Sequence, residues 1–525
     1  MNCRRFSLCA LCLLCVFVVN SAAAPPVLAP LFPAGGQRGT TIEIAAAGTK
    51  MWSEGKVISF EPAKDKGRFS VKVAADAVPG TYWLRSVNDD GASNLRPFIV
   101  GMLPEVLEKE PNDEPKQPQA LSESCVVNGK LARSGDVDCF SIAAKKGQTL
   151  VASLEANRTL KSPMDGVIQI VSVDGFVLDE NNDFHGLDPQ AMYSVPKDGM
   201  YIVRLFAFPA QPDTTIRFAG ADSYIYRLTI TTGGFLDSTI PLSTGPSAKA
   251  VEARGWNIPD DAKSLPVGKA DPFESHATVF HAKLANPFRV RVEAAPVVSS
   301  THVFSKPGEE VMVRFSGKKG QALSLAAESR SLGLAVDPVI RVLDKDAKVL
   351  ARAEPPKLAS DTALSFTPPA DGDYTAAVSD LYAGSGPRHA FLLRVLAAEP
   401  DYDLILAADR FAIPPGKSLD VPVKIVRKNG FAKPVEIAPE NLPAGVTFEI
   451  KPPAGKPDPN QVTLTLAAEK ATPGGAFRVF GKVKDEPALT RLARAPVAEL
   501  DGTTADLWVS ANANGGAPPE PKKKR

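Results

Sequence analysis

Two short acidic segments carry the most distinctive chemistry in the sequence. Acidic or amide side chains alternate along each segment, and alternate side chains of an extended strand point the same way. The residues, including the aspartate that follows the first alternation, are Glu108, Glu110, Asn112, Asp113, Asp136 and Asp138. Calcium takes about six to eight oxygen ligands from carboxylates, amides and backbone carbonyls. The pattern therefore predicts one calcium site, with a solvated acidic linker as the alternative.

The residues around the two segments favour this geometry. Pro111 restrains Glu110, the residue before it, to an extended backbone. In the second segment, Asp136 and Asp138 share a strand face with the apolar residue Phe140. We therefore expect both aspartates to lie at the rim of a sheet, where its hydrophobic core ends.

Cys125 and Cys139 are the only cysteines that follow residue 23. They lie on two expected strands joined by a turn near residues 132–135. An oxidising compartment would favour a disulfide between them. We predict that disulfide, and two buried free thiols are the alternative.

No familiar catalytic motif is present. The five histidines are scattered, and none forms the His-Glu-x-x-His pattern of a metalloprotease. The stretch 383–386 is only a turn and lacks the Gly-x-Ser-x-Gly pattern of a serine hydrolase. The formal net charge of +1 gives no bulk attraction for nucleic acid. The sequence predicts a protein that is not an enzyme, and a hydrolase with an unfamiliar site built from loops is the alternative.

Strand-like alternation dominates the chain. It is clear in residues 41–44, 69–73, 224–230 and 462–466. The 47 prolines and 39 glycines also suit many short strands and turns better than long helices. A chain of 525 residues is too long for one core and predicts about three to five domains. We expect an all-β protein of tandem β-sandwiches arranged as a stiff rod.

Three internal repeats divide the chain. Each is a strand–turn–strand block, and the blocks keep their order: 145–150 recurs at 318–323, 164–168 at 336–340 and 195–201 at 368–374. Such self-similarity predicts one duplicated larger sandwich, each copy preceded by a smaller one. The expected segments are 1–23, a signal peptide; 24–103, a small sandwich; 104–235, the first larger one; 236–299, a short second small one; 300–400, the second larger one; 401–511, a last sandwich; and 512–525, a disordered basic tail.

The first two dozen residues predict export. Arg4 and Arg5 precede an apolar run over residues 8–19, and small residues follow up to Ala23. This is the pattern of a cleaved signal peptide, and a retained membrane anchor is the alternative. No later run is long and apolar enough to span a bilayer. We expect an exported mature chain without a membrane span, in the periplasm, at the cell surface or secreted.

The stretches 107–113, 135–140, 146–150 and 198–201 together resemble the bacterial pre-peptidase C-terminal (PPC) domain. Residues 300–400 resemble a degenerate copy, and residues 24–103 resemble the TIG/immunoglobulin-like domains that precede PPC domains in exported proteins. The resemblance implies jelly-roll-like and immunoglobulin-like sandwiches. It also implies that Glu108, Glu110, Asn112 and Asp113 match calcium ligands of collagen-binding relatives.

PPC domains are usually accessories of secreted peptidases, and no peptidase domain is attached here. We therefore expect a non-catalytic binding or structural protein of the cell envelope or extracellular space. Its expected partner is a protein or polysaccharide of the envelope or matrix. The alternative is an accessory or inhibitory subunit of a separately encoded secreted peptidase. The second copy lacks the Glu-Pro-Asn-Asp motif, so only the first is expected to bind calcium.

Overall fold

The computed structural model describes residues 24–512 apart from 56, 212–216, 271–272, 274, 294–297, 358, 453–457, 498–499 and 501. The predicted signal peptide, and the predicted tail from residue 513 on, lie outside the described residues. Almost every element in this part of the chain is a strand. The helical elements are single turns: α1 (Asn157–Leu160), η1 (Asp260–Ala262) and η2 (Arg330–Leu332). The all-β prediction is confirmed.

The described strands pair only within five consecutive groups, which we call units I to V. Each unit has its own hydrophobic core cluster. The core forms because alternate residues of each strand turn inward; in β5, Phe69, Val71 and Val73 are buried. Whether each unit folds by itself at the predicted boundaries stays a prediction.

Unit I is a small two-sheet sandwich. One sheet has the order β1-β8-β6-β3 with β7 on β6, and the other has the order β2-β5-β4. The strands are β1 (Gly35–Gln37), β2 (Thr41–Ala45), β3 (Lys50–Ser53), β4 (Ile58–Pro62), β5 (Arg68–Val73), β6 (Gly80–Asn88), β7 (Gly91–Ala92) and β8 (Arg96–Gly101).

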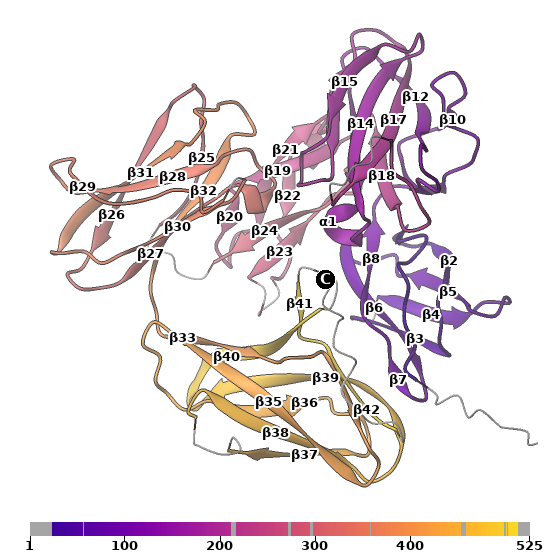
Figure 1. Cartoon of the computed structure of the whole chain (residues 1–525). Helices are drawn as coiled ribbons and strands as arrows, with labels where there is room; N and C mark the ends of the chain where they lie inside the picture. Colours follow the sequence, from indigo (N-terminus) through magenta and orange to yellow (C-terminus); the bar gives the residue numbers. More distant parts are fainter. Residues whose placement is uncertain are drawn as a thin grey trace, which may run out of the picture.

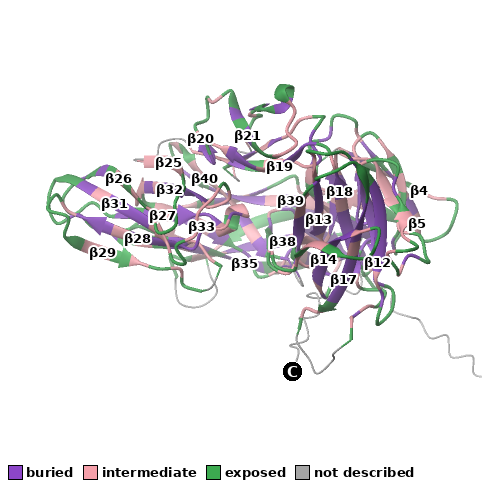
Figure 2. Ribbon diagram, turned by 90° about the horizontal axis from the view of Figure 1, so that it is seen from above, coloured by how far each residue is buried: buried purple, intermediate pink, exposed green. Residues whose placement is uncertain are grey.

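Unit II is larger, with two five-stranded sheets ordered β10-β12-β17-β14-β15 and β16-β13-β18-β11-β9. Figure 2 shows long buried stretches in β12, β13, β14, β17 and β18. The strands are β9 (Glu105–Leu107), β10 (Gln119–Ala120), β11 (Cys125–Lys130), β12 (Asp138–Ala144), β13 (Thr149–Glu155), β14 (Met164–Ser172), β15 (Val177–Asn181), β16 (Gln190–Ser194), β17 (Gly199–Pro209) and β18 (Ile225–Thr231).

Unit III is the smallest, with two three-stranded sheets ordered β19-β21-β22 and β20-β24-β23. Its short β20 pairs in parallel with β24, as β1 pairs with β8 in unit I. The strands are β19 (Phe235–Ile240), β20 (Ser243–Thr244), β21 (Ala250–Trp256), β22 (Ser264–Pro266), β23 (His276–Val279) and β24 (Phe288–Val292).

Unit IV has two four-stranded sheets, and unit V has ten strands connected in one sheet around one core. The strands of unit IV are β25 (Val298–Val303), β26 (Glu310–Gly317), β27 (Leu323–Glu328), β28 (Pro338–Leu343), β29 (Val349–Ala353), β30 (Thr362–Phe366), β31 (Gly372–Asp380) and β32 (Ala390–Ala397). Those of unit V are β33 (Asp401–Ile405), β34 (Arg410–Ile413), β35 (Lys417–Lys428), β36 (Glu436–Glu440), β37 (Val446–Lys451), β38 (Gln461–Ala468), β39 (Thr472–Val483), β40 (Glu486–Pro496), β41 (Thr503–Thr504) and β42 (Leu507–Ala511).

Units II and IV share one topology. The order β11-β18-β13-β16 in unit II matches β25-β32-β27-β30 in unit IV, and β12-β17-β14-β15 matches β26-β31-β28-β29. This agreement is what a duplicated sandwich predicts. Unit II carries two additional edge strands, β9 and β10, and the sheets of unit IV end without them.

Unit V packs against unit I, so the first and last units of the described chain meet (Figure 1). Arg85, which is wholly buried, donates to Asp409 Oδ2 (2.8 Å) and to the carbonyl of Asp506 (3.2 Å). Trp52 and Trp508 pack edge to face, with ring centroids 6.2 Å apart. The expected stiff rod is therefore wrong, because a buried interface joins residues 324 positions apart in the sequence.

The expectation that the tail begins at residue 512 is also wrong by one residue. Asn512 is only 6% exposed, and its side chain donates to the carbonyl of Asp90 in unit I. Its backbone N–H donates to the carbonyl of Ile413 (3.1 Å). Asn512 therefore belongs to the interface between units I and V.

The two cysteines of unit II point to different sides of its sandwich. Cys125 of β11 lies in the core between the two sheets. Cys139 of β12 lies on the outer face of the other sheet, against Val171 and Ile202. Both are buried free thiols. The predicted disulfide is wrong because Phe140, the next residue of β12, takes the core side and turns Cys139 outward.

Candidate metal centre

The two acidic segments meet at one edge of unit II, where β9 pairs in parallel with β11. Beyond β9, the N–H of Glu108 donates to the carbonyl of Asn128 (3.0 Å). Further along, the carbonyl of Asn112 accepts the N–H of Cys139 (2.9 Å). The segment 108–113 therefore crosses from β11 of one sheet to the start of β12 in the other.

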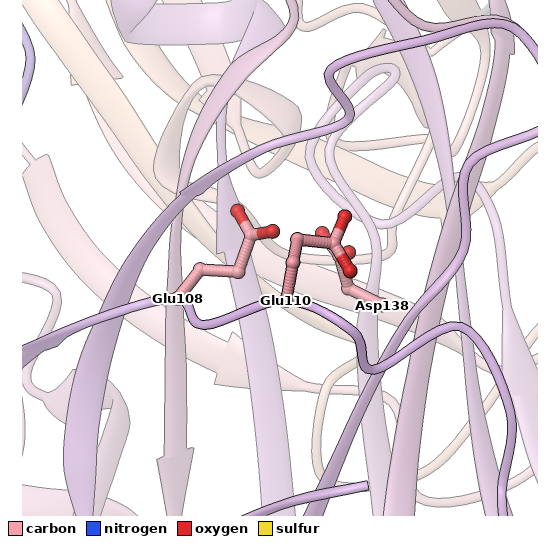
Figure 3. A group of neighbouring side chains, drawn as sticks. All are labelled: Glu108, Glu110 and Asp138. Atoms are coloured by element: carbon pink, nitrogen blue, oxygen red, sulfur yellow. The ribbon is translucent and has the colours of Figure 1, made fainter. Parts of the chain in front are cut away.

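Glu108, Glu110 and Asp138 form the first acidic group, with one ligand oxygen of each within 4.8 Å of the others. Figure 3 shows their carboxyl groups beside one another. The N–H of Lys130 donates to Glu108 Oε2 (2.7 Å), and the hydroxyl of Tyr226 donates to Asp138 Oδ2 (2.5 Å). Neutral donors therefore hold these two carboxylates in place without cancelling their charge.

Gly129 makes the close approach of Glu108 and Tyr226 possible. It lies opposite Tyr226 in the pairing of β11 with β18. A Cβ at this position would lie 2.2 Å from Tyr226 Oη and 2.6 Å from Glu108 Oε2. Both distances are far inside van der Waals contact, so any other residue would displace the hydroxyl, the carboxylate or both.

Glu110, Asp113 and Asp136 form the second acidic group, which shares Glu110 with the first. Asp136 is 0% exposed. Its Oδ2 accepts the N–H of Ala132 (2.5 Å), whereas its Oδ1 accepts no hydrogen bond in the described part of the chain. A buried carboxylate oxygen without a donor is costly unless a cation neutralises it.

Asn112, also 0% exposed, joins the two acidic segments. With the amide turned so that its nitrogen faces the carboxylates, Asn112 donates to Glu110 Oε2 (3.0 Å) and to Asp138 Oδ1 (3.3 Å). The opposite orientation of the amide places its oxygen there, since amide oxygen and nitrogen occupy equivalent positions. Asn112 can therefore donate to the carboxylates in the absence of a cation and serve as an oxygen ligand in its presence.

Burial makes the ionised cluster unfavourable when no cation is bound. It raises the pKa of Asp138 to about 9 and the pKa of Glu108 to about 7. Repulsion from neighbouring carboxylates, above all Glu108 acting on Asp138 and Glu110 acting on Glu108, raises both pKa values further. Burial also raises the pKa of Asp136. A divalent ion would displace these protons and supply the missing positive charge.

Five of the six predicted residues therefore come together as two acidic groups able to hold a metal ion such as calcium, and the sixth, Asn112, lies beside them. Their donor atoms are carboxylate and amide oxygens, without the nitrogen and sulfur ligands typical of zinc. Asp136 Oδ1 accepts no hydrogen bond but lies 3.3 Å from Arg133 Nε, and both this environment and the position of the Asn112 amide show that the site is built to balance negative charge.

Sequence reasoning missed three residues of this site: Gly129, Arg133 and Tyr226. Tyr226 lies in an alternating strand, where its spacing indicates only a core position. Arg133 lies in a turn only three residues before Asp136, but its pairing with Asp113, 20 positions away, depends on how the chain folds back. Only the glycine left a signal, as an isolated glycine inside the strand-like run that forms β11.

No known protein family matches the chain, and no curated protein matches it. Among solved structures it is similar to the M60 catalytic domain with the CBM51-1 and CBM51-2 domains from Clostridium perfringens ZmpB. The identity is 10%, the TM-score is 0.23, and the match covers 72% of this chain and 40% of that chain. A likeness this distant carries no functional argument, so this multidomain all-β chain has no family assignment. Across the described residues, no helix is long and apolar enough to cross a membrane.

Proposed function

We propose that this chain is a non-catalytic exported protein that acts as a binding or structural element of the cell envelope or extracellular space. A calcium ion in unit II fixes the segment 108–113 across its two sheets. The observation that carries the proposal is the convergence of five carboxylates, two of them fully buried, in a cluster of oxygen ligands. The resemblance of residues 107–150 to PPC domains supports both calcium binding and export.

The burial of Asp136 and Asp138 favours metal binding over acid–base catalysis. A catalytic acid must reach its substrate, whereas Asp136 and Asp138 are each 0% exposed. Two cavities of the described chain lie in other places, one beside Lys417 and Lys470 and one beside Trp83. The carboxylates with raised pKa values line neither cavity.

Calorimetric titration of the chain from Ala24 to Arg525 with CaCl₂ tests the calcium proposal. We expect saturable binding and a thermal shift that EDTA reverses. Glu110→Gln removes the carboxylate that both acidic groups share and should abolish both signals. Glu310→Gln is the matched control, because Glu310 is an exposed glutamate at the start of the corresponding strand β26 of unit IV and belongs to neither acidic group. Absence of calcium-dependent heat in the unmodified chain would contradict the proposal.

Export and partner binding need separate tests. Cell fractionation with N-terminal sequencing should find a mature chain that begins at Ala24 outside the cytoplasm. Affinity capture from the cell envelope, with and without calcium, should then recover a protein or polysaccharide that binds better in calcium. A full-length chain in the cytoplasm would contradict the proposed localisation and leave the calcium site unaffected.

A further inference from the structure

Arg133 already places a positive charge on the second acidic group. It lies in the turn between β11 and β12, and its Nη2 donates to both carboxylate oxygens of Asp113 (3.0 and 2.9 Å). Its Nε lies 3.3 Å from Asp136 Oδ1. Arg133 therefore contacts two of the three residues of this group, and the oxygen it approaches on Asp136 is the one without a hydrogen bond.

The first acidic group has no such cation. Its hydrogen-bond donors are the backbone N–H groups of Lys130 and Asn112 and the hydroxyl of Tyr226, all neutral. No ion pair joins Glu108, Glu110 or Asp138 to a lysine or arginine among the described residues. The two groups share Glu110 but differ in how their charge is balanced.

We propose that Arg133 acts as a built-in cation that occupies the second acidic group, so that the chain binds one calcium ion, at Glu108, Glu110 and Asp138. This inference rests on the proposed calcium-binding function and sets the number of ions that the site takes. Removal of the guanidinium opens the second group to a second ion.

Electrostatics explains why the guanidinium and a second ion exclude each other. An arginine stays charged at any pH the protein meets, and it binds carboxylates through fixed donors. A calcium ion on Asp113 and Asp136 would lie beside that charge and would compete for the same oxygen atoms. The side chain of Arg133 is 65% exposed, so it can leave the group or be replaced without disturbing the core.

Calcium stoichiometry of the chain from Ala24 to Arg525 tests this inference. Calorimetric titration with CaCl₂, checked by metal analysis after gel filtration, should give one ion per unmodified chain and two for Arg133→Gln. Arg133→Lys keeps the charge and should keep one ion. Arg158→Gln removes another exposed arginine of unit II, paired with Glu155, and should also keep one ion.

A second variant locates the additional ion. Asp113→Asn alters only the second group, so in the Arg133→Gln background it should return the count from two to one. Glu108→Gln alters only the first group, so in the same background it should leave the second ion in place.

The outcomes separate this inference from the proposed function. One ion in both the unmodified chain and Arg133→Gln, or two ions in the unmodified chain, would overturn the role of Arg133 and leave calcium binding intact. No binding to either chain would overturn both. Two ions in Arg133→Gln that persist with Asp113→Asn would also overturn it, because the second ion would then lie elsewhere.

Discussion

Units II and IV share one sandwich topology, but matching positions carry polar residues in unit II and apolar residues in unit IV. Through the matching strand registers, Asp138 and Tyr226 of unit II correspond to Val311 and Phe391 of unit IV. A buried hydroxyl–carboxylate pair in one copy is thus an apolar pair in the other, where Phe391 is 0% exposed. The fold itself does not require the acidic cluster, since one copy closes its core without it.

The edge of the sandwich is also more polar in unit II than in unit IV. Unit II adds β9 and the segment 108–113 outside β11, whereas the corresponding β25 ends its sheet. Gly129 in unit II leaves room for Tyr226 and Glu108, and the corresponding residue of unit IV is His302, stacked on Phe391. Unit II therefore has an acidic rim that could hold a cation, where unit IV has an uncharged one.

The largest expected effect comes from giving unit II the residue of unit IV at this position. Gly129→His should destabilise unit II by about 3 kcal/mol or more, because even a Cβ would overlap Tyr226 and Glu108. Differential scanning calorimetry should show the loss with and without calcium. The control is His302→Gly in unit IV, which should open a cavity there and leave calcium binding unchanged. A Gly129→His chain that melts normally and binds calcium would contradict the described packing.

The pH dependence of stability should differ with calcium. In EDTA, Glu108 and Asp138 bind their protons more tightly in the folded state than in the unfolded state, because folding raises both pKa values. The resulting stabilisation is fully present below the ordinary pKa values of 4.5 and 3.8. That stability is lost as pH rises through about 7 for Glu108 and about 9 for Asp138.

Saturating calcium should flatten this loss, since the ion replaces the protons as the balancing charge. Melting temperatures measured from about pH 5 to pH 9 in EDTA and in calcium check both statements. The calcium affinity itself should rise over the same range. Parallel curves in the two conditions would show that these carboxylates do not bind the ion.

Replacing the polar pair Asp138 and Tyr226 of unit II by the apolar residue types found in unit IV should remove the response to calcium. The double variant Asp138→Val with Tyr226→Phe deletes one ligand and its buried donor together. At a calcium concentration 100-fold above the dissociation constant, the unmodified chain should gain about 2.7 kcal/mol, and the variant should not. In EDTA the variant should be at least as stable as the parent, because an apolar pair replaces a buried polar one. A retained thermal shift would count against Asp138 as a ligand.

The smallest expected effect concerns a feature that both copies keep. Asp188 accepts the N–H groups of Ala156, Asn157 and Arg158 at the start of α1 (3.2, 2.7 and 2.9 Å). Asp361 does the same for the turn at η2 in unit IV. Replacing either aspartate by asparagine should cost about 1–2 kcal/mol. Chemical denaturation should give similar losses of unfolding free energy for the two variants, unchanged by calcium. A loss for only one of them would show that the two aspartates do not play the same role.

Much of the site could be predicted from the sequence because its ligands follow a local rule. Glu108, Glu110 and Asn112 alternate, and alternation fixes the side of an extended segment on which they lie. The repeats likewise indicated a duplicated sandwich, since strand and turn patterns are short-range. The same rule applied to Cys139 would have turned it away from the core that Phe140 faces, which the disulfide prediction overlooked.

By itself, the sequence determined the all-β fold class, the duplication and the two acidic segments, because strand periodicity and turn residues act over a few positions. Only the tertiary structure decided how distant segments meet. It placed Arg133 on Asp113, Tyr226 on Asp138 and Arg85 of unit I on Asp409 of unit V. Each of these contacts joins residues 20 to 324 positions apart, and their burial depends on how whole sheets pack rather than on any local pattern.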